Sequence, residues 1–272
     1  MAPALGHLLD SLGWAILHSL WQGVLAAVAV IFFRNITKDN HAALRYGVQF
    51  LSLVACFAAF LVTFSIYQIQ PHTTYETVSI NGAAQQITDI FLGAAQAGSF
   101  ADRTSLSATI TPYTPLLGIF WCVGFIGLAA RYCGAFVMTQ RLRRVGISPV
   151  PKQWERRFAT LVLNAGIRHD VKIFISSRVS GPLTLGFFKP IVLVPASFFA
   201  GLPAAQVEAI LFHEIAHIRR HDYLINLLQT AIKTIFFFHP AIHFISSKID
   251  NDREHACDDF AVALTRDPQA LA

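Results

Sequence analysis

Three long apolar runs constrain the fold of this chain more than any other feature of its sequence. They occupy residues 14–33, 46–69 and 116–137. A helix of about 20 apolar residues crosses the roughly 30 Å hydrocarbon core of a bilayer, where irregular backbone would leave its polar groups unpaired. Composition agrees, because 54% of the residues are hydrophobic, 14% are charged and the mean hydropathy is +0.50. The sequence therefore predicts a mainly α-helical, multi-pass membrane protein with three transmembrane spans.

Lysine and arginine residues are distributed unevenly around these runs. They cluster between the first two runs and after the third, at Arg34, Lys38, Arg45, Arg141, Arg143, Arg144, Lys152, Arg156 and Arg157. The connection at 70–114 contains a single one, Arg103. Because cytoplasmic loops are enriched in these residues, the pattern predicts an external amino terminus, an external loop at 70–114 and a cytoplasmic segment at 138–272. The asymmetry accounts for the net charge of +5, and without interleaved basic and aromatic side chains we expect no direct nucleic-acid partner.

The chemistry of the chain is concentrated at His213, Glu214 and His217. Helix-forming residues precede them from Pro203 onward, so this motif is predicted to lie within a helix. Residues four apart share one helical face, so both imidazoles can bind a single Zn²⁺ while Glu214 lies beside the open coordination position. The pattern is typical of a hydrolytic zinc centre with Glu214 as its catalytic carboxylate. The alternative is that the two histidines only line a helical face and that Glu214 is solvated.

An acidic cluster at residues 251–259 can supply the third zinc ligand. A catalytic zinc ion takes three protein ligands and keeps a fourth position for water. We assign the third ligand to Glu254, with His255 and Asp258 as alternatives. One turn after Glu254, Asp258 is placed to accept a hydrogen bond from a ligand histidine and to fix its tautomer. A helix that turns both carboxylates inward is expected to point Cys257 elsewhere.

The reaction expected from these assignments uses Glu214 twice. Its carboxylate takes a proton from a water molecule that zinc activates, and it returns the proton to the departing amine. The developing oxyanion needs a further hydrogen-bond donor. The sequence leaves four candidates open for that role, namely His221, His239, His243 and Arg253.

The segment 138–272 is predicted to fold as an α+β unit around this centre. Helices are expected at 154–164, across the zinc-binding motif and after Pro240, and short strands at 171–175, 184–188 and 191–194. An exposed edge of this small sheet can pair with an extended substrate, or the sheet can simply support the zinc-binding helix. Residues 224–238 are almost wholly apolar but short for a full crossing, which leaves a core helix, a re-entrant segment or an interfacial helix open.

Several further motifs stand in order along the chain. They are HSLWQG at 18–23, LRYG at 44–47, a Gly-Pro-rich stretch at 181–195, HEIAH at 213–217, FHP at 238–240 and REHACD at 253–258. In this order they resemble the BlaR/MecR-type membrane zinc metallopeptidases, the antibiotic-responsive sensor-transducers of bacteria, over nearly the whole chain. The resemblance implies a zincin-like fold of the gluzincin type, with His213, His217 and Glu254 as zinc ligands and Glu214 as the catalytic residue.

The resemblance also implies a location and a role. It implies a bacterial inner-membrane protein, surrounded by lipid, that cleaves itself or a repressor-type regulator in signal transduction. Two alternatives stay open: a non-catalytic zinc-containing receptor or scaffold, and a housekeeping quality-control protease. Sensor-type relatives continue through another span into an external ligand-binding domain. We therefore expect either a truncated carboxyl end at Ala272 or a member that receives its signal by another route.

Overall fold

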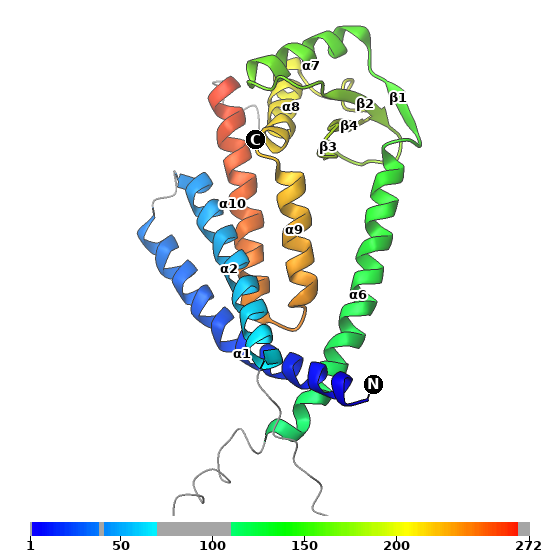
Figure 1. Cartoon of the computed structure of the whole chain (residues 1–272). Helices are drawn as coiled ribbons and strands as arrows, with labels where there is room; N and C mark the ends of the chain where they lie inside the picture. The colour runs from blue at the N-terminus through cyan, green and yellow to red at the C-terminus, as the bar shows by residue number, and fades with distance from the viewer. Residues whose placement is uncertain (1, 38–40, 70–109, 266–272) are drawn as a thin grey trace, which may run out of the picture. The chain divides into compact units, whose positions relative to one another are not determined.

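The computed structural model describes residues 2–37, 41–69 and 110–265, and the expected external loop at 70–114 lies mostly outside these residues (Figure 1). Three long helices of the described part are apolar enough to cross a membrane, and they are α1 (Ala2–Ile36), α2 (Ala42–Ile69) and α6 (Thr114–Leu142). Each leaves large apolar side chains exposed, such as Phe32, Leu51 and Phe120 at 68% each. The three predicted spans are thus confirmed as helices, and all of them extend beyond at least one predicted end.

Contacts divide the chain into two compact units, Met1–Gln22 with Cys56–Gly124 and Gly23–Ala55 with Phe125–Ala272. In the first unit, polar side chains of α1 and α2 face each other. His18 Nε2 lies 3.0 Å from the Tyr67 hydroxyl, and the Gln22 amide donates to the Thr63 hydroxyl at 3.2 Å. Such bonds hold helices together in lipid, where burial of apolar surface contributes little. The HSLWQG motif therefore serves partly in the packing of α1 on α2.

A four-stranded sheet in the second unit has the strand order β1-β2-β4-β3. Its strands are β1 (Ile147–Pro149), β2 (Lys172–Ser176), β3 (Leu183–Leu185) and β4 (Ile191–Pro195). The central pair β2 and β4 is parallel, and both outer strands are antiparallel to their neighbours, so β3 lies at an edge.

The small sheet is confirmed, with two differences from the strands expected from the sequence. The sequence does not predict β1, because three residues that end in a proline show no alternation of apolar and polar side chains. Strand β3 is shorter than the predicted 184–188, because Gly186 adopts a φ of +94° and turns the chain. Phe188, at the end of the predicted strand, is 90% exposed.

Four helices complete the second unit, and they are α7 (Lys152–Asn164), α8 (Ala204–Arg219), α9 (Asp222–Ile235) and α10 (Pro240–Thr265). Its core is formed by apolar side chains of α7, α8 and the central strands, including Phe158, Leu161, Val192, Val194, Leu211 and Ile215. Helix α8 packs along α10 (Figure 1). This packing holds the face of α8 that carries the HEIAH motif against α10.

Two of the ordered sequence motifs meet between α1 and α10. Gly23 of α1 lies so close to His239 that a Cβ atom at position 23 would come within 2.3 Å of the imidazole Nε2. His239 is buried, and Pro240 begins α10 directly after it. The glycine of HSLWQG therefore makes room for the histidine of FHP, which gives the two motifs a shared structural role.

Candidate metal centre

Helices α8 and α10 bring two imidazoles and one carboxylate together. His213 and His217 stand one turn apart on α8, and Glu254 reaches them from α10. Glu254 Oε2 lies 3.4 Å from His213 Nε2 and 3.6 Å from His217 Nε2. The candidate ligand atoms all fall within 4.8 Å of one another, so a single ion can contact all three. The three residues assigned to zinc from the sequence therefore form one cluster.

Each imidazole of the cluster is held by a carboxylate on its other nitrogen. His213 Nδ1 lies 2.8 Å from Asp258 Oδ1, and His217 Nδ1 lies 2.9 Å from Asp222 Oδ2. A proton on Nδ1 that is donated to the carboxylate leaves the Nε2 lone pair free for a metal ion. Both Nε2 atoms face Glu254, so the carboxylates favour the tautomers that metal binding requires. The donor set of two imidazoles and one carboxylate fits a catalytic zinc ion.

Asp222 is the residue of this centre that sequence reasoning missed. Helix α8 ends at Arg219, and His221 adopts a φ of 59°, the only positive φ of a non-glycine residue in the described part of the chain. This left-handed turn begins α9 at Asp222 and directs its carboxylate back to His217. The His221 ring packs against Phe187, with 5.5 Å between ring centroids. An acidic residue directly after the end of the HEIAH helix is the signal that could have indicated Asp222.

Glu214, the expected catalytic carboxylate, is buried beside the two imidazoles. Thr184 of the edge strand β3 donates a hydrogen bond from Oγ1 to Glu214 Oε2 at 2.7 Å. A cavity of about 290 Å³ opens onto the cluster, and Pro182, Leu183 and Thr184 line it together with Glu254 and both histidines. Strand β3 therefore orients Glu214 and also borders the space that a substrate would occupy.

Charges within the cluster shift its pKa values in opposite directions. Burial lowers the pKa of His217, but hydrogen bonds to Asp222, Cys257 and Glu254 outweigh burial and raise this pKa to about 12. For His213, burial again lowers the pKa, and its hydrogen bond to Glu254 contributes to a net rise. Hydrogen bonds from both imidazoles hold the pKa of the Glu254 carboxyl well below its usual range. Protons and a metal cation therefore compete for the same side chains of the cluster.

Cys257 does not point away from the centre, so the expectation from the sequence is wrong. Its Sγ lies 3.4 Å from His217 Nδ1 and 3.6 Å from Asp222 Oδ2, and the residue is fully buried. Residues three apart on a helix share a face, so positions 254 and 257 turn inward together. His217, Asp222 and Cys257 form a second group of candidate ligand atoms on the Nδ1 side of the imidazole. Burial raises the pKa of the Cys257 thiol, which disfavours the thiolate that metal binding needs.

The other two ligand candidates lie differently. His255 is exposed and belongs to neither group of candidate ligand atoms within the described residues. The carboxylate of Asp258 contacts His213 Nδ1, not the Nε2 side where Glu254 lies. The arrangement favours Glu254 as the third ligand and Asp258 as the residue that orients His213.

The four oxyanion candidates are separated by the structure. Arg253 lines the cavity of the cluster. The other three candidates, His221, His239 and His243, do not line it. His239 is buried near α1, and His243 contacts the backbone carbonyl of Phe237. Arg253 Nε lies 3.3 Å from Glu254 Oε1, and its side chain is 14% exposed. Arg253 is therefore the candidate that can contact a substrate in this cavity.

Helices α1 and α2 contact the α10 helix close to the cluster, within the second unit. Asp252, two residues before Glu254, is fully buried and forms an ion pair with Arg34 of α1. The Arg45 guanidinium of α2 lies 3.3 Å from Asp252 Oδ1, and the Gln49 amide donates a hydrogen bond to Asp252 Oδ2 at 2.6 Å. A buried carboxylate needs such partners, because an unpaired charge would be strongly destabilising. The polar ends of two spans thus help to fix the helix that carries Glu254.

Helix α2 also contacts the carboxylate that holds His217. The Tyr46 hydroxyl donates to Asp222 Oδ1 at 3.3 Å, and Arg220 Nε lies 3.5 Å from the same oxygen. The Arg220 guanidinium stacks over the Tyr46 ring, 4.7 Å from its centroid. Asp222 is therefore held from two sides while its second oxygen contacts the imidazole.

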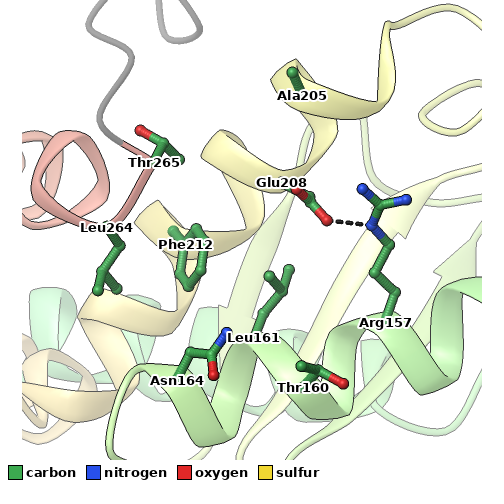
Figure 2. A pocket seen from close by; sticks show the side chains of 9 residues that line it. All are labelled: Arg157, Thr160, Leu161, Asn164, Ala205, Glu208, Phe212, Leu264 and Thr265. Carbon is green, nitrogen blue, oxygen red and sulfur yellow. Dashed lines mark hydrogen bonds and ion pairs between the residues drawn. The ribbon is translucent and has the colours of Figure 1, made fainter.

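A second, larger cavity of about 500 Å³ lies among side chains of α7, α8 and the end of α10 (Figure 2). Among the described residues that line it, Glu208 of α8 is the only carboxylate, and it forms an ion pair with Arg157 of α7. No imidazole or thiol stands among these described lining residues. The described part of this cavity therefore lacks the donor set of a catalytic zinc site, which the lining of the smaller cavity contains.

Comparison with known proteins gives one family. A family model described as BlaR1 peptidase M56 matches residues 14–269. The regulatory protein BlaR1 of Bacillus licheniformis is 23% identical over 261 residues, which cover 93% of this chain and 42% of that protein. The BlaR1 protein of Staphylococcus aureus is 21% identical over 235 residues, 86% of this chain and 40% of that protein. The methicillin resistance mecR1 protein of Staphylococcus aureus is 32% identical over 91 residues, 34% of this chain and 16% of that protein. The chain thus spans less than half the length of these curated relatives.

Proposed function

This chain belongs to the BlaR1 peptidase M56 family, and we propose that it is a zinc metallopeptidase that hydrolyses peptide bonds on the cytoplasmic side of a bacterial inner membrane. One observation above all supports the proposal. Two imidazoles whose Nδ1 atoms are held by carboxylates turn their Nε2 atoms toward Glu254. We assign the metal to His213, His217 and Glu254, and the catalytic role to Glu214.

The chain's own residues account for the proton transfers of such a reaction. When bound at this site, zinc polarises the scissile carbonyl and lowers the pKa of water. Glu214 accepts the proton of the attacking water and returns it to the departing amine. Thr184 orients the Glu214 carboxylate through its hydrogen bond to Oε2. Arg253 borders the cavity and offers N–H donors to the developing oxyanion.

Strand β3 is suited to binding an extended substrate. It is an edge strand, it pairs with β4 through Leu183 and Thr184, and both residues also line the cavity. A substrate segment that adds to this edge would gain backbone hydrogen bonds and lie across Glu214 and the metal ligands. Pro182 lacks an N–H group, so pairing begins after it. This mode of binding favours an extended peptide without a strict demand on its sequence.

The side of the membrane and the role in signalling are parts of the same proposal. Residues 1–137 form the transmembrane region and residues 138–272 the peptidase domain, and the distribution of Lys and Arg favours a cytoplasmic location for the latter. Two of the relatives are named regulatory proteins, which favours cleavage of the chain itself or of a repressor-type regulator. A housekeeping protease would instead cleave many unrelated membrane proteins.

The test compares the wild-type chain with the Glu214→Gln variant, both purified in detergent. The variant keeps all three proposed ligands, so we expect unchanged zinc content and loss of self-cleavage or of cleavage of an added peptide library. Undiminished cleavage would refute the role of Glu214. A Glu254→Ala variant should lose zinc, and full zinc content in that variant would refute the ligand assignment. A cleavage-site survey that finds one protein substrate favours a regulatory role, and many substrates would indicate general turnover.

A further inference from the structure

Helix α9 exposes a stripe of leucines and buries the polar residues Asp222, Gln229 and Thr234 together with Ile232. Leu224, Leu227 and Leu228 form a stripe at helical spacing with 46%, 45% and 44% exposure. On the opposite face, Gln229 is 1% exposed, and its amide donates to the Ser246 hydroxyl at 2.7 Å and to Asp250 at 2.9 Å. A surface helix in water has the reverse arrangement, with its apolar stripe against the core. The solvent that suits this exposed face is lipid.

Contacts of α10 and of the turn before it with α1 indicate how deep this turn lies in the membrane. Asp252 pairs with Arg34, near the polar end of α1, and His239 lies against Gly23 farther along the same helix. Gly23 is about 16 Å along α1 from Arg34 at 1.5 Å per residue. That distance is about half of the roughly 30 Å hydrocarbon core. The turn between α9 and α10 therefore lies near the middle of span α1.

We propose that α9 and the first half of α10 form a re-entrant hairpin that enters the bilayer to about its midplane, with the leucine stripe of α9 against acyl chains. Helix α9 has 14 residues, which is too short to cross the membrane alone. The buried Gln229 amide nitrogen donates its hydrogen bonds to α10 inside the hairpin and so is kept away from lipid. Phe236, Phe237 and Phe238 supply an apolar turn at the tip.

The hairpin also sets the height of the metal cluster relative to the membrane. Glu254 follows Asp252 by two residues, and the arginines that pair with Asp252 flank the connection between the first two spans. Arginines at span ends lie in the headgroup region. If the proposed peptidase function holds, peptide bonds close to the membrane surface are those that reach the cavity.

The test uses the full chain with Glu214→Gln, which prevents self-cleavage, in vesicles of phosphatidylcholine and phosphatidylglycerol. A photoreactive benzoylphenylalanine replaces Leu228 on α9, Leu116 on span α6 or Leu163 on α7. Leu116 lies on a candidate span and Leu163 on α7 outside the candidate spans, so they serve as the lipid-facing and water-facing controls; both are exposed, at 61% and 70%. After illumination, mass spectrometry measures lipid adducts at each position.

We expect lipid adducts at Leu228 with a yield comparable to that at Leu116 and well above that at Leu163. A yield at Leu228 no higher than at Leu163 would overturn the hairpin. Cross-links from Leu228 to a second copy of the chain in place of lipid would also overturn it and would identify a protein interface. None of these results depends on catalysis, so failure of the hairpin is distinguishable from failure of the proposed peptidase function.

Discussion

Replacing Asp222 by asparagine should weaken zinc binding more than replacing Asp258 does. Both carboxylates contact the Nδ1 atom of a proposed ligand histidine, at 2.9 Å for Asp222 and 2.8 Å for Asp258. They differ in their surroundings, because the Asp222 side chain is 4% exposed and the Asp258 side chain is 49% exposed. Each Asn variant keeps the shape of the side chain and removes its negative charge. The pair therefore compares one interaction in a buried and in a solvated setting.

The expected magnitudes follow from this difference in exposure. Loss of a carboxylate that orients a ligand histidine costs about 10- to 100-fold in metal affinity, or about 1.4–2.7 kcal/mol. Water does not screen the buried Asp222 charge, so we place Asp222→Asn at about 100-fold. Solvent screens half-exposed charges, so we place Asp258→Asn at about threefold, below 1 kcal/mol. The ratio of the two losses in zinc affinity therefore tests the effect of burial more directly than either loss alone.

The assay is competition for zinc against a fluorescent chelator, with the protein in detergent near neutral pH. Tyr46→Phe is the control for Asp222, because it removes the 3.3 Å bond from the tyrosine hydroxyl and leaves the contact to His217 intact. We expect this control to change zinc affinity by less than about threefold. Equal effects of Asp222→Asn and Asp258→Asn, or a larger effect of the latter, would refute the argument from burial.

Three further outcomes are expected. Thr184→Val should leave zinc content unchanged and lower kcat by about tenfold, measured with a peptide substrate, because Glu214 loses the donor that orients it. Zinc binding near neutral pH should release at least one proton, measured by calorimetry in buffers of different ionisation enthalpy. The raised pKa of His217, about 12, keeps that imidazole protonated until the metal arrives, so affinity should also rise with pH. Gly23→Ala should destabilise the protein by about 1–3 kcal/mol in thermal unfolding, because the new Cβ would lie 2.3 Å from the His239 ring.

Each of these outcomes has a matched comparison. Thr184→Ser keeps the hydroxyl, so it should restore most of the activity, and failure to do so would mean that the threonine acts through packing. Zinc binding without proton uptake by the buffer would contradict the raised pKa of His217. Gly6→Ala adds a Cβ to the same helix with no heavy atom within 4 Å. An equal loss of stability in that variant would contradict the claim that the contact with His239 requires glycine at position 23.

The spans and the HEIAH motif were predictable because they depend on local patterns. A run of apolar residues marks a span whatever lies beside it, and residues four apart share a face in any helix. Glu254 was assigned correctly to the neighbourhood of the histidines because an acidic cluster shortly downstream supplies the ligand type that zinc takes. These inferences need no knowledge of how distant segments meet.

The residues that support the centre were not predictable in this way. Thr184 belongs to a short strand without a functional motif. Its hydroxyl contacts Glu214 only because β3 lies beside α8. Asp222 becomes a partner of His217 through the left-handed turn at His221, a conformation that a histidine adopts only occasionally. Cys257 was misplaced because residues 254 and 258 share a helical face with residue 257, which also turns inward and contacts His217.

The buried charge at Asp252 bears on which part of the chain holds the site together. Its carboxylate is fully buried and takes its partners from Arg34, Arg45 and Gln49, all of them outside residues 138–272. Removal of one partner from a buried ion pair costs about 3–5 kcal/mol, comparable to the whole stability of a small domain. A fragment without the first two helices would therefore bury an unpaired charge two residues from Glu254 or rearrange α10 to expose it. The smallest part expected to keep the metal cluster is accordingly the second compact unit, which joins residues 23–55 to residues 125–272.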